Sequence, residues 1–477
     1  MANGPGDARL ARLAQLDQRY VWHPFTQMQD WLRGEPIVIV RGRGAVLWDA
    51  EGRKYLDANS SIWTNLHGHN RPEINAAIRR QLRKVAHTSA LGLANEPASL
   101  LAERLVRLAK TSEGSALTKV FFSDDGSTAM EVALKLSHEY WRRNGVPTPR
   151  FLSLEGGYHG DTIGAVSLGH IELFHKTYGP LLFPTEKVMA PYCYRCPYNQ
   201  SKPERADART YRKCNWECVG EVEKKFAGAN REGRRITGFV VEPLMQGAAG
   251  MIPQPDGWLA KVARIARDYR SHILADEIMT GMGRTILPSG RRPGIFASLA
   301  AGVTPDFVAV AKGLTGGYLP LAATLTTQSV FDAFLGEYHE FKTFFHGHSF
   351  TGNQLGSAAA LASLDLLAKT DTSRHRIALA RQMEDSLKEL WQLPQVGDIR
   401  QAGLVAGIEL VRNWQTREPY DLRDRAGIRV CEAMAKAGVL TRPIGNVIVI
   451  MPPFCTRLSE LRRMISTLAR SIRTVLA

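Results

Sequence analysis

The chain lacks several features that would place it in a membrane or outside the cell. No apolar run reaches the roughly eighteen residues that a membrane-spanning helix needs. The opening segment, MANGPGDARLARLAQ, has neither an apolar core nor a small-residue cleavage site, so we expect no signal peptide. Internal repeats and low-complexity linkers are also missing. The sequence therefore predicts a cytoplasmic globular protein without a membrane partner.

Acidic residues are fewer than basic ones. The 46 Asp and Glu face 61 Lys and Arg, which gives a net charge of +15. The basic residues are spread along helical patterns such as IRRQLRK, and the densest basic region, 202–235, has acidic residues among its charges. This distribution is typical of a solvated surface, so we expect no nucleic-acid partner. A net-positive surface modestly attracts anionic metabolites, which fits small-molecule substrates.

Apolar residues make up 44% of the 477 residues, enough for two or three domains with sizeable cores. Short apolar strands alternate with helical stretches, a pattern that predicts a mainly parallel sheet buried on both faces. From about residue 355 the pattern predicts a smaller α/β domain. We expect an N-terminal segment (1–70) that contributes to the small domain, a large domain (71–350) and a C-terminal small domain (351–477). The strands expected in the large sheet are 119–123, 150–156, 236–243, 272–277 and 306–312.

The stretch VAVAKGLTGGYLPL places a lysine, Lys312, where a buried strand breaks into a glycine-rich turn. Lysine is almost never fully buried without a partner. The strand 272–277 ends in two acids, Asp276 and Glu277, and buried carboxylates also need partners. In an open α/β sheet, ligands bind beyond the carboxyl ends of the strands. Both strand ends are therefore candidates for a ligand site.

Two further strand ends carry polar motifs. Gly126 and Ser127 follow the strand 119–123 and open a helix, which makes either an anion cradle or an ordinary helix cap. Tyr158 and His159 follow the strand 150–156 in a glycine-rich turn, which suits either a flat ligand or a tight turn with a half-buried aromatic residue.

A single ligand accounts for all four strand ends. It would bring a phosphate to Gly126 and Ser127, a flat ring to Tyr158, a basic ring nitrogen to Asp276 and an aldehyde to Lys312. Pyridoxal 5′-phosphate has these four groups. An acid beside the ring nitrogen keeps it protonated, and a lysine can carry a proton to and from the substrate's α-carbon. The motifs thus predict a pyridoxal-phosphate enzyme.

The blocks EPLMQGAAGMIP, ILADEIMTGMGRT, AVAKGLTGGYLPL and HGHSFTGNQ resemble those of the class III pyridoxal-phosphate aminotransferases, which have the fold-type I architecture. The resemblance implies a homodimer with active sites at the subunit interface. It implies that Lys312 is the Schiff-base lysine and Asp276 the partner of the ring nitrogen. The cofactor-binding residues it implies are Gly126, Ser127, Tyr158, His159, Asp276 and Lys312, with His348 and Ser349 reaching the phosphate from the neighbouring subunit.

The end blocks VWHPFTQM and RPIGNVIVIMPPF are more selective, and with GGYHGDTIGAVSLG they resemble the branch of the family that works in biotin biosynthesis. That resemblance implies transfer of an amino group to 8-amino-7-oxononanoate, giving 7,8-diaminononanoate. It also implies that Arg442 binds the substrate carboxylate, a role that suits the bidentate fork of an arginine. The alternative for Arg442 is one more surface arginine. The expected substrate-binding residues are Phe25, Ile62, Trp63, Tyr158, Gly347 and Arg442.

The amino donor stays open between S-adenosylmethionine and L-lysine. Members that use adenosylmethionine typically show a Trp-Trp pair where this chain has Ile62 and Trp63, and a tyrosine where it has Phe25. These differences resemble the subgroup that uses lysine. The block after GMGRT, ILPSGRRPGIFAS, also looks longer than in the family, and we expect it to be a surface loop.

Four of the six cysteines form a CxxC and a CxxxC pair separated by seventeen residues, within an insert near 191–220. Zinc or iron–sulfur ligands have such spacing, whereas four reduced cytosolic thiols are the alternative. A structural metal at Cys193, Cys196, Cys214 and Cys218 is therefore an expectation, and we assign it no catalytic role.

Two other functions remain compatible with the sequence. One is a class III aminotransferase that acts on a diamine or an ω-amino acid, against which Arg442 and the end blocks argue. The other is a non-catalytic regulator that binds pyridoxal phosphate. Intact Lys312, Asp276 and Tyr158 argue against a regulator, because a binding protein need not keep a proton-transfer lysine.

Overall fold

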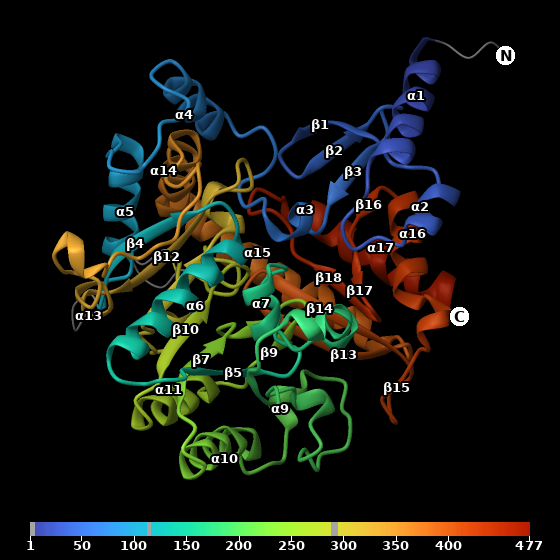
Figure 1. Cartoon of the computed structure of the whole chain (residues 1–477). Helices are drawn as coiled ribbons and strands as arrows, with labels where there is room; N and C mark the ends of the chain where they lie inside the picture. The colour runs from blue at the N-terminus through green and yellow to red at the C-terminus, as the bar shows by residue number, and fades with distance from the viewer. Residues whose placement is uncertain (1–4, 112–115, 288–293) are drawn as a thin grey trace.

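The computed structural model describes residues 5–111, 116–287 and 294–477 of the chain. It is a mixed α/β fold built around one large sheet, with two smaller sheets formed by the two ends of the chain (Figure 1). This is the fold class predicted from the sequence, because the large sheet is mostly parallel. No helix of the described part has the length and apolar composition to cross a membrane. Six residues of the segment expected as a surface loop, 288–293, lie outside the described residues.

The large sheet has seven strands in the order β4-β12-β11-β10-β7-β5-β6. The strands from β11 to β6 run parallel to their neighbours, whereas β12 pairs antiparallel with both β11 and β4. The five expected strands are all present; the sequence pattern missed β6 and β12. Their bounds are β4 Leu117–Ser123, β5 Arg150–Leu154, β6 Glu186–Val188, β7 Ile236–Val241, β10 His272–Asp276, β11 Phe307–Val310 and β12 Ala322–Thr327.

Helices cover both faces of this sheet because its side chains alternate between two apolar clusters. Residues such as Val240, Leu274 and Phe307 pack against α6 (Gly126–Arg143) and α7 (Ile163–Leu168). Their strand neighbours, such as Phe239 and Ile273, pack on the opposite face against α10 (Glu217–Arg231) and α11 (Trp258–Asp268). Because side chains alternate along each strand, every second apolar side chain faces the same layer of helices.

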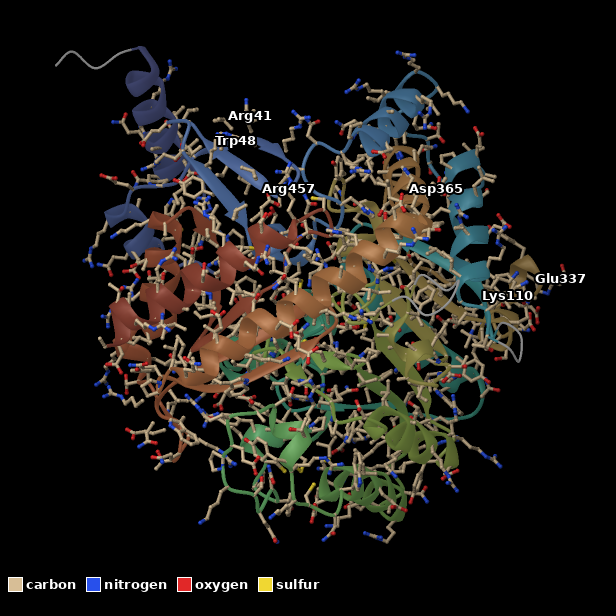
Figure 2. All side chains as sticks on the ribbon, turned by 180° about the vertical axis from the view of Figure 1, so that it is seen from behind. Arg41, Trp48, Lys110, Glu337, Asp365 and Arg457 are labelled. Atoms are coloured by element: carbon tan, nitrogen blue, oxygen red, sulfur yellow. The ribbon has the colours of Figure 1, made fainter. Side chains whose placement is uncertain are left out.

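The N-terminal and C-terminal parts of the chain share a sheet. Strands β1 (Ile39–Arg43), β2 (Val46–Asp49) and β3 (Lys54–Asp57) form an antiparallel ribbon, and β16 (Val439–Leu440) joins β3 in parallel. In Figure 2 the side chains of Arg41 and Trp48 mark this ribbon, and Asp365, Glu337 and Lys110 lie on the other side of the molecule. The division at residues 70 and 350 itself stays a prediction.

The C-terminal part forms a second small sheet covered by long helices. Its main path is β13-β14-β18-β17, and β13 and the long helix α15 were not expected from the sequence. The bounds are β13 Val396–Ala402, β14 Val405–Asn413, β17 Pro443–Ile444, β18 Val447–Ile450, α14 Gln354–Ala368, α15 Thr370–Leu387, α16 Ala426–Lys436 and α17 Leu458–Leu476. Two helices from earlier in the chain, α4 (Pro72–Leu82) and α5 (Glu96–Leu108), contact α14.

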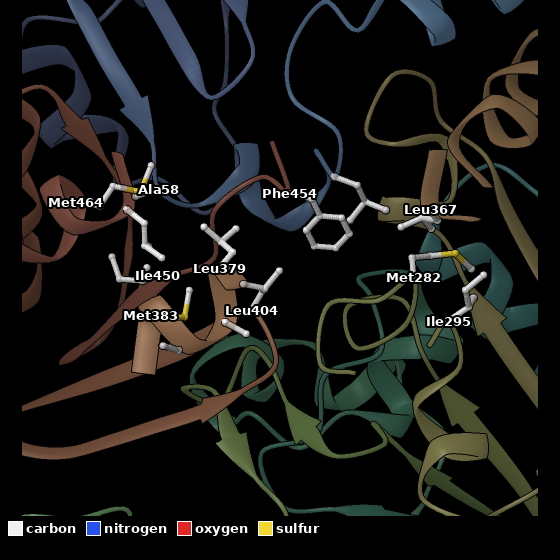
Figure 3. Close-up of a cluster of buried hydrophobic side chains, with 14 of the residues drawn as sticks. Ala58, Met282, Ile295, Leu367, Leu379, Met383, Leu404, Ile450, Phe454 and Met464 are labelled. Carbon is white, nitrogen blue, oxygen red and sulfur yellow. The ribbon is translucent and has the colours of Figure 1, made fainter. Parts of the chain in front are cut away.

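The largest core cluster joins these parts. Figure 3 shows Phe454 between a group that includes Leu379 and Leu404 and a group that includes Leu367 and Met282. The guanidinium groups of Arg284 and Arg376 each lie 5.0 Å from the Phe454 ring. Arg284 donates to the backbone carbonyls of Pro452 and Asn65. Buried Arg284 thus joins the segment after β10 to both the N-terminal and the C-terminal parts of the chain.

Candidate active site

The candidate site is a cavity of about 710 Å³ at the carboxyl edge of the large sheet. A residue at or just after the end of each of five strands contributes to its lining. Gly126 follows β4, Tyr158 follows β5, Glu242 follows β7, Asp276 ends β10 and Lys312 follows β11. The structure therefore brings together the four strand ends that the sequence singled out. The carboxyl ends of parallel strands share one edge, which is why residues far apart in sequence meet here.

Lys312 occupies a strained position with its amine facing the cavity. Its φ is +27°, in the left-handed range that side-chain-bearing residues rarely adopt. Burial lowers the pKa of Lys312, although the charges of Asp276 and Glu242 oppose that shift. Its Nζ lies 4.7 Å from the centre of the Trp63 ring. Within the described residues it forms no ion pair, so its amine is available to a ligand.

Asp276 is held by two donors at the bottom of the cavity. Its Oδ2 lies 2.7 Å from Nδ1 of His159, and its Oδ1 accepts the Ile278 N–H at 3.1 Å. Burial alone would lower the pKa of His159, but the hydrogen bond and the negative charge of Asp276 outweigh it and raise the pKa. The raised pKa favours the protonated imidazole, which donates its Nδ1–H to Asp276 and holds the carboxylate in place.

Glu242 is a buried acid in the lining that the sequence analysis did not single out. Its carboxylate accepts the backbone N–H groups of Tyr158 (3.3 Å) and Gly247 (2.8 Å). Burial raises the pKa of Glu242 to about 7, and the charge of Asp276 adds to the shift. The signal was present, because Glu242 ends the apolar strand ITGFVV just as Asp276 ends HILA.

The N-terminus of α6 points its first amides toward the cavity, where they have no partner inside the helix. Asp125 caps the helix by accepting the Thr128 N–H at 2.9 Å. Ser127 Oγ accepts the Thr162 N–H at 3.0 Å and lies 2.8 Å from Thr162 Oγ1. Thr162, which sequence reasoning missed, thus completes a small polar cradle with Gly126 and Ser127. Such a helix start suits a phosphate.

Aromatic side chains line the mouth of the site. The Tyr158 hydroxyl donates to Asp161 at 2.6 Å, and its ring lies nearly parallel to His175, with centroids 6.4 Å apart. Phe25 meets Tyr158 edge-on at 6.5 Å and Phe174 at 5.2 Å. Phe25 therefore contacts a residue of the lining, and its role in substrate binding stays a prediction; Phe174, from the short helix α8 (Glu172–His175), is an addition that only the fold reveals.

The pair Ile62 and Trp63 lies on a left-handed stretch of backbone, with φ values of +61° and +69°. Trp63 lines the cavity, whereas Ile62 is 44% exposed and is not part of the lining. Residues held in such conformations persist only where the surrounding structure fixes them, and they cluster at functional sites. The backbone here places the Trp63 ring against the Lys312 amine.

Arg442, Gly347, His348 and Ser349 do not line the cavity in this single chain. Arg442 is exposed and precedes β17, where Ile444 packs on the cluster that contains Trp63 and Met279. His348 Nδ1 lies 3.2 Å from Asp124, which does line the cavity. The four residues therefore lie near the site, and their expected roles stay predictions.

The expectation of a metal at the four cysteines is not supported. All four thiols are free, and among the described residues no group of three or more His, Cys, Asp or Glu could hold a metal ion. Burial raises the pKa of Cys193 to about 12 and that of Cys218 to about 11, which favours the neutral thiols. Cys193 packs among Tyr194, Ala208 and Tyr211, and Cys218 faces the α10–α11 core.

The pocket residues fit pyridoxal phosphate. They offer an amine without an ion-pair partner, a fixed carboxylate and a helix N-terminus in one cavity. Comparison with known proteins agrees, because the family model "Aminotransferase class-III" matches residues 29–472. Fold and site together define a pyridoxal-phosphate-dependent transferase, and the chain belongs to the class III aminotransferase family.

Curated relatives span nearly the whole chain. The adenosylmethionine-8-amino-7-oxononanoate aminotransferase of Geobacter sulfurreducens is 47% identical over 464 residues, which covers 97% of this chain and 98% of the relative. The enzyme with the same name in Aquifex aeolicus is 43% identical over 463 residues, covering 97% of each chain.

Solved structures with a similar fold include members with different names. The crystal structure of the adenosylmethionine-8-amino-7-oxononanoate aminotransferase of Methanocaldococcus jannaschii has a TM-score of 0.87 at 38% identity, covering 97% of this chain and 99% of that one. An (S)-enantioselective ω-transaminase from Thermomicrobium roseum also reaches 0.87, at 30% identity, covering 98% and 99%. The shared fold therefore does not by itself choose the substrate.

Proposed function

We propose that this aminotransferase transfers an amino group to the ketone of 8-amino-7-oxononanoate and forms 7,8-diaminononanoate in biotin biosynthesis. The single observation that carries the proposal is Lys312, a strained lysine facing Asp276 across the cavity, in a chain whose near-full-length relatives carry that activity in their names. When bound, pyridoxal phosphate supplies an electron sink that makes a proton on the substrate's α-carbon labile.

The chain's own residues would do the remaining chemistry. Lys312 binds the cofactor through its amine and then moves a proton to and from the substrate carbon, for which a lowered pKa suits it. Asp276, held in place by its hydrogen bond with His159, would hold the proton on the cofactor's ring nitrogen. Tyr158 covers the ring, and its backbone is fixed by Glu242. The α6 N-terminus with Gly126 and Ser127 holds the phosphate.

The substrate would extend from Lys312 toward the aromatic mouth and Arg442. Phe25, Ile62 and Trp63 offer an apolar path for the carbon chain, since Trp63 lines the cavity and Phe25 packs on Tyr158. Arg442, beyond that path, would bind the terminal carboxylate, and Gly347 would leave room at the opening. An arginine fork placed beyond an apolar path would favour a long keto acid, whose carboxylate can reach it, over a short one.

The test is a pair of half-reactions with the holoenzyme. One of the two donors, S-adenosylmethionine or L-lysine, should convert the bound cofactor to its aminated form. The visible absorbance of the cofactor should then disappear. Adding 8-amino-7-oxononanoate should then restore the absorbance. If ω-amino acids or diamines convert the cofactor while 8-amino-7-oxononanoate fails to restore it, the ω-transaminase alternative replaces the proposal. If no amine converts it, the chain is a pyridoxal-phosphate-binding regulator.

The protein would act as a homodimer with shared active sites. The segments around residues 91 and 338–350 expose large apolar side chains, among them Leu91 and Tyr338, each 92% exposed. Covering such a surface with a second copy would bring His348 and Ser349 to the neighbouring phosphate cradle. Co-expressed chains carrying Lys312→Ala and His348→Ala/Ser349→Ala should regain activity that neither variant has alone; light scattering should give a dimer. The cytoplasmic location stays a prediction.

A further inference from the structure

One wall of the active-site cavity is a strained turn. Residues 247–251 connect β8 (Met245–Gln246) to β9 (Ile252–Pro253), and the turn closes with Gly250 and Met251 N–H donating to the Gly247 carbonyl. Gly250 has a φ of +113° and Met251 a φ of +54°. A left-handed methionine costs about 1–2 kcal/mol and persists only where neighbouring groups hold it.

The turn contacts the groups expected to bind cofactor and substrate. Gly247 N–H donates to Glu242, whose other oxygen fixes the Tyr158 backbone. A Cβ added at Gly247 would lie 3.1 Å from Met279 and 3.5 Å from Trp63, so the turn packs closely on both. Ala248 lines the cavity itself. A shift of this turn would therefore move Tyr158, Trp63 and the cavity wall together.

Arg400, on β13, holds the turn from the side away from the cavity. Its Nε donates to the carbonyls of Gly250 (3.1 Å) and Met251 (2.9 Å), and its Nη2 donates to Gly250 at 2.6 Å. The Arg400 side chain is 1% exposed. These three hydrogen bonds hold Gly250 and Met251, the two residues whose backbone is strained. Arg400 is therefore the group that fixes their conformation.

Arg400 is in turn held by two buried carboxylates. Its Nη1 donates to Asp398 at 3.0 Å and to Glu409 at 2.7 Å. Two carboxylates facing one guanidinium leave an excess negative charge in a dry interior, which is costly unless another cation balances it. Burial raises the pKa of Asp398 to about 6, in keeping with that cost.

The balancing cation comes from the cysteine segment, which we define as residues 191–218. Arg195 Nε donates to Glu409 at 2.7 Å, and its Nη2 lies 2.5 Å from the same oxygen. The hydroxyl of Tyr192 donates to the other Glu409 oxygen, and the Arg400 guanidinium lies 5.0 Å from the Tyr192 ring. Arg209 of α9 (Ala208–Tyr211) in this segment donates to the Gln401 carbonyl of β13 at 2.7 Å, and Figure 1 shows where the two elements lie. The cysteine segment therefore closes a chain of contacts that ends at the cavity wall.

We propose that the cysteine segment is a positioning element for the active site, acting through Arg195, Glu409 and Arg400 on the turn 247–251. Arg195 and Tyr192 are positioning residues, because they touch neither the cavity nor its ligands. The effect on substrate rests on the proposed function, whereas the effect on the turn does not. The segment thus holds the strained turn of the cavity wall. Its position in the sequence, between two strands of the large sheet, would not reveal this role.

Two matched variants of full-length protein test the proposal. Arg195→Met keeps much of the side-chain volume and removes the charge from Glu409. Arg205→Met is the control: Arg205 also belongs to the cysteine segment and also donates to the C-terminal part, at the carbonyls of Val396 and Leu393, but it does not contact Glu409 or Arg400. Arg195→Lys restores the charge without the fork, and Tyr192→Phe removes one hydrogen bond if Arg195→Met does not fold.

The first readout is hydrogen–deuterium exchange of the peptide containing residues 245–253. Local opening sets exchange rates, so amides in this peptide should exchange about tenfold faster in Arg195→Met, with smaller effects in Arg195→Lys and Tyr192→Phe and none in Arg205→Met. The proposal is wrong if the exchange rates in Arg195→Met do not change, or if they change equally in Arg205→Met. If Arg195→Met does not fold, unchanged exchange rates in Tyr192→Phe overturn the proposal instead.

The second readout separates this proposal from the proposed function. With 8-amino-7-oxononanoate, kcat/KM should fall about tenfold in Arg195→Met, with most of the loss in KM, because a displaced wall misplaces the substrate. If the wild-type enzyme does not act on this substrate, the proposed function fails and the exchange experiment still decides the positioning role. If exchange changes and kcat/KM does not, the segment stabilises the turn without serving the site, and the proposal fails.

Discussion

Replacing Asp276 by asparagine tests the electrostatic core of the site. Asp276 is 4% exposed, so water screens its charge little. Asparagine can still accept the Ile278 N–H, but it removes the negative charge that faces His159 at 2.7 Å. His159 should then lose its proton, because burial alone lowers the pKa of that residue. Neither neutral side chain can then stabilise a positive charge on the ring nitrogen of the cofactor.

The expected loss is large. Removing one preorganised charge-stabilising group from a dry active site costs about 2.7–4 kcal/mol of transition-state stabilisation, or roughly 10²–10³-fold in kcat. The affinity for pyridoxal phosphate should fall much less, because the α6 N-terminus and Ser127 remain. Single-turnover rates with the amino donor, measured on fully loaded enzyme, would isolate the chemical step from cofactor loss.

Asp306→Asn is the matched control. Asp306 precedes β11 at the opposite edge of the same sheet, where its carboxylate accepts the Ile273 N–H at 2.8 Å. Asparagine can make the same bond, so kcat should stay within about twofold of wild type, as for most substitutions away from a site. A loss of less than tenfold in Asp276→Asn, about 1.4 kcal/mol, would refute the role given to Asp276. An equal loss in both variants would show that the effect comes from the sheet and not from the site.

Three further predictions concern single residues. Lys312→Ala should abolish both transamination and borohydride fixation of the cofactor to the chain. Lys261→Ala, at an exposed lysine, should leave both intact. If peptide mapping of the wild-type protein finds the cofactor fixed to another lysine, the assignment is wrong. Arg442→Ala should raise KM for 8-amino-7-oxononanoate by about tenfold or more, and Arg442→Lys should recover part of that loss. Arg423→Ala, at another exposed arginine, should leave KM unchanged. An unchanged KM for Arg442→Ala in steady-state assays would make Arg442 structural. His159→Gln should lower the free energy of unfolding most at pH values below about 6.5, and the difference from wild type should shrink as pH rises through the raised pKa of folded His159; a difference that grows with pH in denaturant titrations would reverse the sign of this linkage.

The strands of the large sheet were predictable because burial on both faces gives nearly continuous apolar runs. FVAV, HILA and ITGFVV each end in or shortly before a polar residue of the site, so the positions of Lys312, Asp276 and Glu242 at strand ends follow from local pattern alone. The short edge strand β6 and the strand β12 were missed. β6 has only three residues, EKV, and β12 is rich in Ala and Thr, so neither gives a strong apolar signal.

The cysteines show the opposite outcome. Their spacing resembled that of a metal site, yet the structure places Cys193 in a small aromatic cluster and Cys218 against the α10–α11 core. Spacing along the chain does not decide whether four sulfur atoms converge, because ligand geometry depends on how the intervening loop packs. The residues of this segment with the clearest contacts to the C-terminal sheet are instead Tyr192 and Arg195, which both bond Glu409 of β14.

The sequence by itself determined the class of fold and the cofactor, and it placed the candidate site residues at strand ends, because strand ends, helix starts and glycine-rich turns are local features with local chemistry. Only the tertiary structure decided which distant groups support them. The pairing of His159 with Asp276, the hold of Glu242 on Tyr158, the packing of Phe174 on Phe25 and the grip of Arg400 on residues 250 and 251 all join segments far apart in the chain. Such contacts depend on how layers pack, and no pattern within a single segment encodes that packing.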